Sequence, residues 1–286
     1  MASDEILLKL ENLQPIGSFK LRGAGNALEL ADQAQLAAGV WTASAGNMAQ
    51  AVAWHARGRN VACTVVVPET APATKLEAIG RLGAEMVKVP FAEWLEVFRT
   101  RAYPGMKGCF VHPFSDPAVM AGNGTIGLEL LEDLPEVDAV LVPYGGGGLC
   151  CGIASAIRAL APSCRIYACE VETAAPLAAS LAAGEPVRVE HVPSFVDGIG
   201  APIVFPEMFE LARQLVDGSI VVSLADVAAA VRLLVERTRV VAEGAGAASV
   251  AAALTGKAGA GRLACIVSGG NIDIGKLQTI LGGKTP

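Results

Sequence analysis

VLVPYGGGGLCCGI, residues 140–153, is the stretch that decides the fold. The apolar run before the glycines predicts a buried strand, and the apolar residues after them predict a helix. Between the two, Gly145, Gly146, Gly147 and Gly148 present bare backbone N–H groups at a helix N-terminus, where phosphate groups bind readily. The stretch therefore predicts a phosphate-binding loop in an α/β fold.

Two better-known phosphate motifs do not fit this loop. A dinucleotide-binding fold needs G-x-G-x-x-G, and Cys150 and Cys151 occupy the positions of the third glycine. Glu170 does lie near the offset at which that fold places its ribose-binding acid. A P-loop needs Gly-Lys-Ser/Thr, which does not follow. The loop predicts phosphate binding without naming the molecule that carries the phosphate.

On both sides of this stretch, short apolar runs alternate with Ala/Leu-rich segments at helical spacing. Strands that are apolar on both faces predict mostly parallel sheets covered by helices. The predicted strands are residues 6–10, 61–67, 85–89, 109–112, 139–142, 165–169, 220–223 and 263–267. The clearest predicted helices are residues 48–57, 74–82, 93–101, 153–160 and 227–241.

No Ser/Gly/Pro-rich linker divides the chain, so a second domain is expected as an insertion. We predict a small inserted α/β domain over residues 39–115. Residues 1–38 and 116–286 would form the larger domain, with the site in the cleft between the two.

Composition excludes several classes of binding partner and site. The net charge of −6, without a Lys/Arg-rich run, argues against nucleic acid and membrane surfaces as partners and favours a small-molecule substrate. The 7 cysteines form no CxxC pair and the 3 histidines are scattered, so neither a metal site nor a disulfide framework is predicted. The start of the chain lacks the features of a signal peptide, which predicts a cytoplasmic protein. Pro143 and the glycines interrupt the uncharged stretch 139–157, so no membrane span is predicted.

Lys20 is the candidate nucleophile. It lies in PIGSFKLRG, residues 15–23, where an extended segment turns into a helix. Ser18 is placed to cap a helix that begins at Phe19, which would put Lys20 in the first turn. The positive end of the helix dipole there disfavours an ammonium group and helps to keep the amine nucleophilic. Taken by itself, the motif is equally compatible with a surface lysine after a capped turn.

Two further turns carry candidate ligand-binding residues. Ser44, Ala45, Gly46 and Asn47 precede a predicted helix, so their amides can receive a carboxylate and the Asn47 side chain can reach a ring oxygen. Ser268 ends a buried strand, and the two glycines after it allow a ligand ring to approach closely. Each turn, taken separately, also fits an ordinary cap or a strand-ending turn.

With these sites in view, the sequence resembles the fold type II pyridoxal phosphate (PLP) enzymes, specifically the threonine/serine dehydratase and serine racemase group. The resemblance extends from about residue 8 to the C-terminus. Six motifs occur in the order typical of that group: KLENLQPIGSFKLRG (9–23), VPETAP (67–72), HPF (112–114), GTIGLE (124–129), GGGG (145–148) and SGGN (268–271). It implies a two-domain fold like that of the tryptophan synthase β subunit.

The resemblance also assigns roles to residues. It implies that Lys20 forms the Schiff base with PLP and that Asn47 contacts the 3-hydroxyl of the cofactor. The 145–148 loop would hold the phosphate, Ser268 would face the pyridine nitrogen, and the 44–47 turn would hold the substrate carboxylate. A hydroxyl facing that nitrogen makes the ring a weaker electron sink than a carboxylate would, which suits elimination of a β-substituent.

The activity implied is dehydration and deamination of a β-hydroxy amino acid, such as threonine or serine, to a 2-keto acid and ammonia. Ala45 stands where racemases have a second serine, which disfavours racemisation, and Met48 replaces the usual histidine, which leaves the substrate side chain open. Glu170 matches one ligand of a divalent-metal site, but Pro176 stands where an aspartate is expected, so no metal is predicted there. The alternatives are β-replacement or racemase chemistry on the same scaffold, or an inactive PLP-binding protein.

The resemblance adds expectations about assembly and chain length. A homodimer is expected. The chain begins about thirty residues later than is usual in the family, and it stops soon after residue 273. No regulatory domain is therefore expected.

Overall fold

The computed structural model describes residues 5–286, and the first four residues of the predicted large domain lie outside that range. The chain forms two compact units. Unit 1 comprises Met1–Phe19 and Gly124–Pro286, and unit 2 comprises Lys20–Asn123. These bounds differ from those of the predicted domains, whose division at 39–115 stays a prediction.

Unit 1 is built on a five-stranded sheet in the order β1-β9-β6-β7-β8, in which every pair of neighbours is parallel. Its strands are β1 (Glu5–Leu10), β6 (Ala139–Pro143), β7 (Arg165–Val171), β8 (Gly218–Val222) and β9 (Arg262–Val267). Its helices are η1 (Glu11–Leu13), α7 (Gly148–Leu160), α8 (Pro176–Ala183), α9 (Pro206–Leu215), α10 (Leu224–Thr238), α11 (Gly244–Leu254) and α12 (Ile274–Leu281). The unit boundary falls within α6 (Pro117–Asp133).

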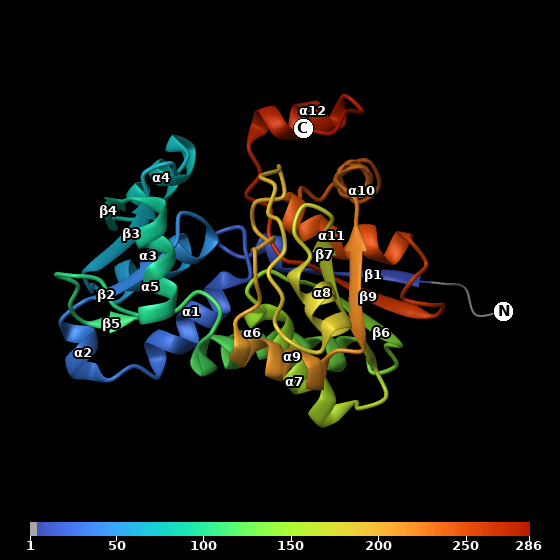
Figure 1. Cartoon of the computed structure of the whole chain (residues 1–286), viewed down its shortest axis with the longest axis horizontal. Helices are drawn as coiled ribbons and strands as arrows, with labels where there is room; N and C mark the ends of the chain where they lie inside the picture. Colours follow the sequence, from blue (N-terminus) through green and yellow to red (C-terminus); the bar gives the residue numbers. More distant parts are fainter. Residues whose placement is uncertain (1–4) are drawn as a thin grey trace. The chain divides into compact units, whose positions relative to one another are not determined.

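Unit 2 is built on a four-stranded parallel sheet in the order β4-β3-β2-β5. Its strands are β2 (Val40–Ala43), β3 (Cys63–Pro68), β4 (Glu85–Val89) and β5 (Cys109–Phe110). Its helices are α1 (Lys20–Glu29), α2 (Gln33–Ala37), α3 (Asn47–Gly58), α4 (Ala73–Arg81) and α5 (Phe91–Thr100). Helices α3 and α5 both pack on β2 and β3 (Figure 1).

The predicted α/β class with parallel sheets is confirmed, and most predicted strands and helices are present. Two ends differ. The predicted strand 109–112 stops at Phe110, because His112 turns to accept hydrogen bonds from the amides of residues 114 and 115. The predicted helix 227–241 ends at Thr238, because Arg239 adopts a left-handed conformation with φ of 62°.

Small residues make the core of unit 1 dense. All residues of α11 from Gly244 to Ala253 are buried, and this helix packs on β6 and β9 (Figure 1). Its sequence, GAGAASVAAAL, carries few side chains larger than a methyl group, so the helix axis can lie close to the sheet. The general alanine richness of the chain thus serves close helix–sheet packing.

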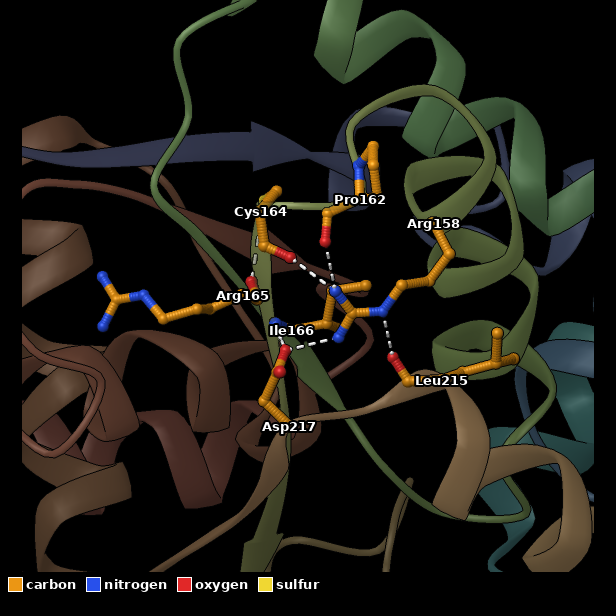
Figure 2. Close-up of polar contacts among 7 residues, drawn as sticks. All are labelled: Arg158, Pro162, Cys164, Arg165, Ile166, Leu215 and Asp217. Carbon is orange, nitrogen blue, oxygen red and sulfur yellow. Dashed lines mark hydrogen bonds and ion pairs between the residues drawn. The ribbon is translucent and has the colours of Figure 1, made fainter.

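One arginine ties three elements of unit 1 together. Arg158, in the last turn of α7, donates from Nε to Leu215 O at 2.9 Å and from Nη1 to Pro162 O at 3.0 Å and Cys164 O at 2.9 Å. Its Nη2 pairs with the Asp217 carboxylate, which also accepts from the amide of residue 166 (Figure 2). The side chain therefore joins the end of α7 and the end of α9 to the start of β7.

We expect Arg158→Ala to lower the free energy of unfolding by about 2–3 kcal/mol, because three carbonyls and one carboxylate lose a shared donor. Urea unfolding followed by circular dichroism measures the change. Arg213→Ala is the matched control, since its pair with Glu210 is exposed, and it should cost less than about 1 kcal/mol. Equal effects of the two substitutions would contradict the structural role of Arg158.

Within residues 5–286, no helix has both the length and the apolar character needed to cross a membrane. All 7 cysteines are present as free thiols.

Candidate functional site

The segment before Lys20 is fixed to the turn that follows β9. Ser18 forms a β-bridge with Gly269, and the amide of Phe19 donates to Ser268 O at 3.0 Å. In return, the amide of Gly270 donates to the carbonyl of residue 17 at 2.9 Å. These contacts lie within unit 1 and hold the residues just before Lys20 against Ser268 and its two glycines.

Lys20 is the first residue of α1, so it lies in the first helical turn, as predicted, although the helix begins one residue later than expected. Its half-buried side chain donates from Nζ to the carbonyl of Pro113 at 2.5 Å. Lys20 and Pro113 are 93 positions apart in the chain. The amine is thus positioned by a loop of unit 2 that is distant from α1 in the sequence. Sequence patterns around Lys20 therefore do not predict this contact.

That loop owes its shape to His112, whose role the sequence analysis missed. The side chain is 1% exposed, and its Nδ1 accepts from the amides of Phe114 at 3.2 Å and Ser115 at 2.9 Å. Since Nδ1 accepts, Nε2 carries the hydrogen and donates to Phe98 O at 3.2 Å. Arg101 donates to Ser115 O at 2.7 Å. The HPF motif was the available signal, because it places a histidine directly before the carbonyl that receives Lys20.

The 44–47 turn joins the end of β2 to the start of α3. Gly46 is the N-cap of α3 and makes no side-chain cap, and Asn47 is the first helical residue. The amide of Ser44 donates to Val66 O at 3.1 Å, and the amide of Gly46 donates to the Ser44 hydroxyl at 3.2 Å. The Ser44 hydroxyl would therefore have to turn away for the Gly46 amide to receive a carboxylate. Binding of a carboxylate by Ser44, Ala45, Gly46 and Asn47 stays a prediction.

The helices that begin at Lys20 and Asn47 are tied together within unit 2. His55 on α3 donates from Nε2 to the carbonyl of Leu21 at 2.8 Å and accepts at Nδ1 from Arg59. Burial is the main cause that lowers the pKa of His55. The lowered pKa keeps the ring neutral, so one ring nitrogen can donate a hydrogen bond while the other accepts one. The side chain thus couples the first turn of α1 to the helix that carries Asn47.

The tetraglycine loop, residues 145–148, lies between β6 and α7, as predicted. Gly147 is the N-cap of α7 with φ of 92°, a conformation that side chains disfavour. In the part of the chain that the structure describes, the amides of Gly145, Gly146 and Gly147 donate no hydrogen bond. Three amide donors at the positive end of a helix of 13 residues fit a phosphate group.

Ser268 lies at the same edge of the sheet as this loop. It directly follows β9, and β9 is the parallel neighbour of β6, after which the loop begins. The side chain is 3% exposed, and over residues 5–286 its hydroxyl forms no hydrogen bond. A hydroxyl on a buried residue at this edge of the sheet fits the predicted contact with a ring nitrogen.

The candidate residues are divided between the units. Ser268 and the tetraglycine loop belong to unit 1, whereas Lys20 and the 44–47 turn belong to unit 2. Along the chain, the peptide bond from Phe19 to Lys20 joins the two sets. The role of each residue stays a prediction.

Glu170, which matches a metal ligand by resemblance, acts here as a helix cap. Its carboxylate accepts from the amides of Leu177 and Ala178, both at 2.8 Å, and from the Ser219 hydroxyl at 2.6 Å. These three donors occupy the carboxylate and hold the N-terminus of α8. Across residues 5–286, no group of three or more His, Cys, Asp or Glu residues is placed to hold a metal ion.

Desolvation is the main cause that raises the pKa of Glu170, against the opposing effect of its three donors. A raised pKa means that the folded state favours the neutral form of Glu170. The side chain therefore contributes its full stability below the pKa of an unfolded glutamate, about 4.3, and this contribution is lost as the pH rises through the pKa of the folded state. We expect the stability of Glu170→Gln to improve relative to the wild type between pH 5 and pH 8. Urea unfolding of both proteins at each pH measures this shift. A constant difference, equal to that of the exposed control Glu190→Gln, would contradict it.

Comparisons with known proteins identify the family of the chain. The family described as "Pyridoxal-phosphate dependent enzyme" matches residues 2–269. The L-threonine ammonia-lyase of Thermotoga maritima is 42% identical over 280 residues, which cover 97% of this chain and 70% of that protein.

Solved structures give the same result. The processed form of threonine deaminase isoform 2 from Solanum lycopersicum matches with a TM-score of 0.87 and 33% identity, over 98% of this chain and 83% of that one. The structure of maize serine racemase matches with a TM-score of 0.86 and 34% identity, over 99% of this chain and 91% of that one. The resemblance seen in the sequence motifs is therefore confirmed.

Proposed function

Because the chain belongs to the family of pyridoxal-phosphate dependent enzymes, we propose that it is an ammonia-lyase that converts L-threonine into 2-oxobutanoate and ammonia. The observation that carries the proposal is the 42% identity to an L-threonine ammonia-lyase over 97% of the chain. The tetraglycine loop and Ser268, at one edge of the unit 1 sheet, support it. L-Serine is the expected second substrate, because it carries the same β-hydroxyl.

Each group of residues would perform one task. The amides of the tetraglycine loop would hold the cofactor phosphate, and the Ser268 hydroxyl would face the ring nitrogen. Asn47 would orient the ring through its 3-hydroxyl, and the 44–47 turn would receive the substrate carboxylate. When bound, the cofactor withdraws electrons from the α-carbon of the amino acid.

Lys20 would move the proton. As a neutral amine, Nζ takes the proton from the α-carbon of threonine, and its position at the start of α1 favours the neutral form. The β-hydroxyl leaves with one proton as water, which balances the α-proton taken by Nζ. A water molecule then hydrolyses the released 2-aminobut-2-enoate to 2-oxobutanoate and ammonia. One water is released and one is consumed, so threonine yields 2-oxobutanoate and ammonia as net products.

Ala45 favours this outcome over racemisation. Racemisation needs a second base to return a proton on the opposite face of the α-carbon, and the methyl group of Ala45 cannot hold one. Ser268 acts in the same direction, because a hydroxyl leaves the cofactor a weaker electron sink than a carboxylate would. A weaker electron sink suits elimination better than racemisation, because elimination does not need a long-lived carbanion.

The test is an assay of the purified protein with PLP and a panel of L-threonine, L-serine, L-3-hydroxyaspartate and their D forms. Release of 2-keto acid and ammonia in equal amounts, fastest with L-threonine, is the expected result. Formation of D-serine from L-serine would assign racemase chemistry, and capture of the carbon skeleton by an added thiol would assign β-replacement. Bound PLP without any product would make the protein an inactive PLP-binding protein.

We also infer that the protein is a cytoplasmic homodimer. The dimer is expected from the family resemblance, and a reducing cytoplasm fits cysteines that form no disulfide framework. Sedimentation equilibrium of the PLP-loaded protein tests the dimer, and a monomer mass at micromolar concentration would contradict it.

A further inference from the structure

Tyr144 carries a buried hydroxyl for which residues 5–286 supply no hydrogen-bond partner. The residue follows β6 and precedes the tetraglycine loop, and its amide is held by Cys169 O at 2.9 Å. The side chain is 2% exposed. Among the described residues, its hydroxyl oxygen is one of few buried polar atoms without a hydrogen-bond partner. A phenol hydroxyl buried without a hydrogen bond destabilises the fold, unless a ligand supplies the missing hydrogen bond.

The hydroxyl lies beside the loop. A Cβ built on Gly147 would be 2.8 Å from the Tyr144 hydroxyl oxygen and 3.0 Å from the terminal methyl of Met208. Gly147 is the N-cap of α7, and its amide is one of the three that donate no hydrogen bond within the described part of the chain. The methyl group of Met208 cannot accept a hydrogen bond. The loop is therefore where an acceptor for Tyr144 can arrive.

The charge state of Tyr144 fits a donor. Burial is the main cause that raises the pKa of the phenol well above its usual value, and the neighbouring Cys151, Cys150 and Glu170 act in the same direction. The hydroxyl therefore keeps its proton over the working pH range. A phosphate oxygen can only accept, so a protonated phenol and three amide donors are complementary to it.

We propose that Tyr144 is a further phosphate-binding residue of the site and donates a hydrogen bond to the phosphate group held by the tetraglycine loop. It would act with the loop amides and fix the depth at which the phosphate is bound. The inference rests on the role of the loop within the proposed function, but it is independent of which amino acid is the substrate.

The test compares two ligands that differ only in the phosphate. Full-length wild type and Tyr144→Phe, each freed of cofactor, are titrated with PLP and with pyridoxal and followed by visible absorbance. We expect the Kd for PLP to rise about 10-fold, a loss of about 1.4 kcal/mol, while the Kd for pyridoxal stays unchanged. Tyr167→Phe, which removes a hydroxyl from β7 of the same sheet, should change neither value.

Two further readouts separate binding from a structural effect. The ³¹P resonance of PLP bound to the holoenzyme should shift in Tyr144→Phe, because a donor to the phosphate is removed. The cofactor-free variant should be at least as stable as the wild type, since an unpartnered polar group has been deleted. An unchanged PLP affinity, or equal weakening of PLP and pyridoxal, would overturn the proposal. Failure of the proposed function would leave these affinities unaffected, because no turnover is measured.

Discussion

Lys20→Ala is expected to lower the rate of 2-oxobutanoate release by at least about 10³-fold. One amine would serve both as the covalent attachment point of the cofactor and as the base for the α-proton, so its loss removes two contributions together. The fold should persist, because the side chain is only half-buried and its hydrogen bond from Nζ to the Pro113 carbonyl lies within unit 2. Steady-state assay of keto acid with PLP in excess measures the loss.

A small external amine distinguishes chemistry from misfolding. Ethylamine should restore part of the activity of Lys20→Ala, because it can supply the missing base, and it should not affect the wild type. Lys88→Ala, at an exposed position on β4, is the matched control and should retain full activity. Activity of Lys20→Ala within 10-fold of the wild type would remove Lys20 from the proposed mechanism.

Gly246→Ala should have the second large effect, although the change adds only one methyl group. A Cβ at position 246 would lie 2.3 Å from Gly269 O and 3.0 Å from Gly269 N, and both atoms are backbone. Gly269 cannot move away, because it forms a bridge with Ser18 and its carbonyl accepts from the Glu243 amide at 3.0 Å. We expect a loss of about 3 kcal/mol in the free energy of unfolding.

The same substitution should weaken PLP binding, because displacement of Gly269 moves the neighbouring Ser268. Urea unfolding and PLP titration of one preparation measure both effects. Gly218→Ala is the control in the same unit, since its Cβ would meet only Tyr167 ring atoms at 3.9 Å, an ordinary contact. If Gly246→Ala unfolds and binds PLP like the control, α11 does not constrain the Ser268 turn.

Local patterns were sufficient for much of the fold. The run of apolar residues, glycines and apolar residues at 140–153 identifies β6, the loop and α7, because strand, turn and helix preferences depend on neighbours in the chain. Strands apolar on both faces predicted parallel sheets for the same reason. The turn residues directly before Lys20 predicted the start of α1 to within one residue.

The hydrogen-bond partners of Glu170 are an example of what local patterns do not predict. The offset of Glu170 from the glycine loop is near that of a ribose-binding acid, and the resemblance matches it to a metal ligand. The sequence predicted neither role, because the third glycine is absent and Pro176 replaces the expected aspartate, but it offered no other partner for the carboxylate. The structure instead gives it the amides of Leu177 and Ala178 and the Ser219 hydroxyl, which is 49 positions away. The partners of a buried carboxylate are chosen by which elements pack around it, and spacing along the chain does not contain that information.

The sequence by itself determined the class of fold and the order of the strands along the chain, because these depend on composition and short-range preferences. Its resemblance to a family of PLP enzymes predicted the residues that would carry the chemistry. Only the tertiary structure placed the Pro113 carbonyl against Lys20, the carbonyl of Gly269 against α11 and the Tyr144 hydroxyl beside Gly147. Hydrogen bonds and close contacts act over a few ångströms in space. Their partners are therefore set by how the sheets and helices pack.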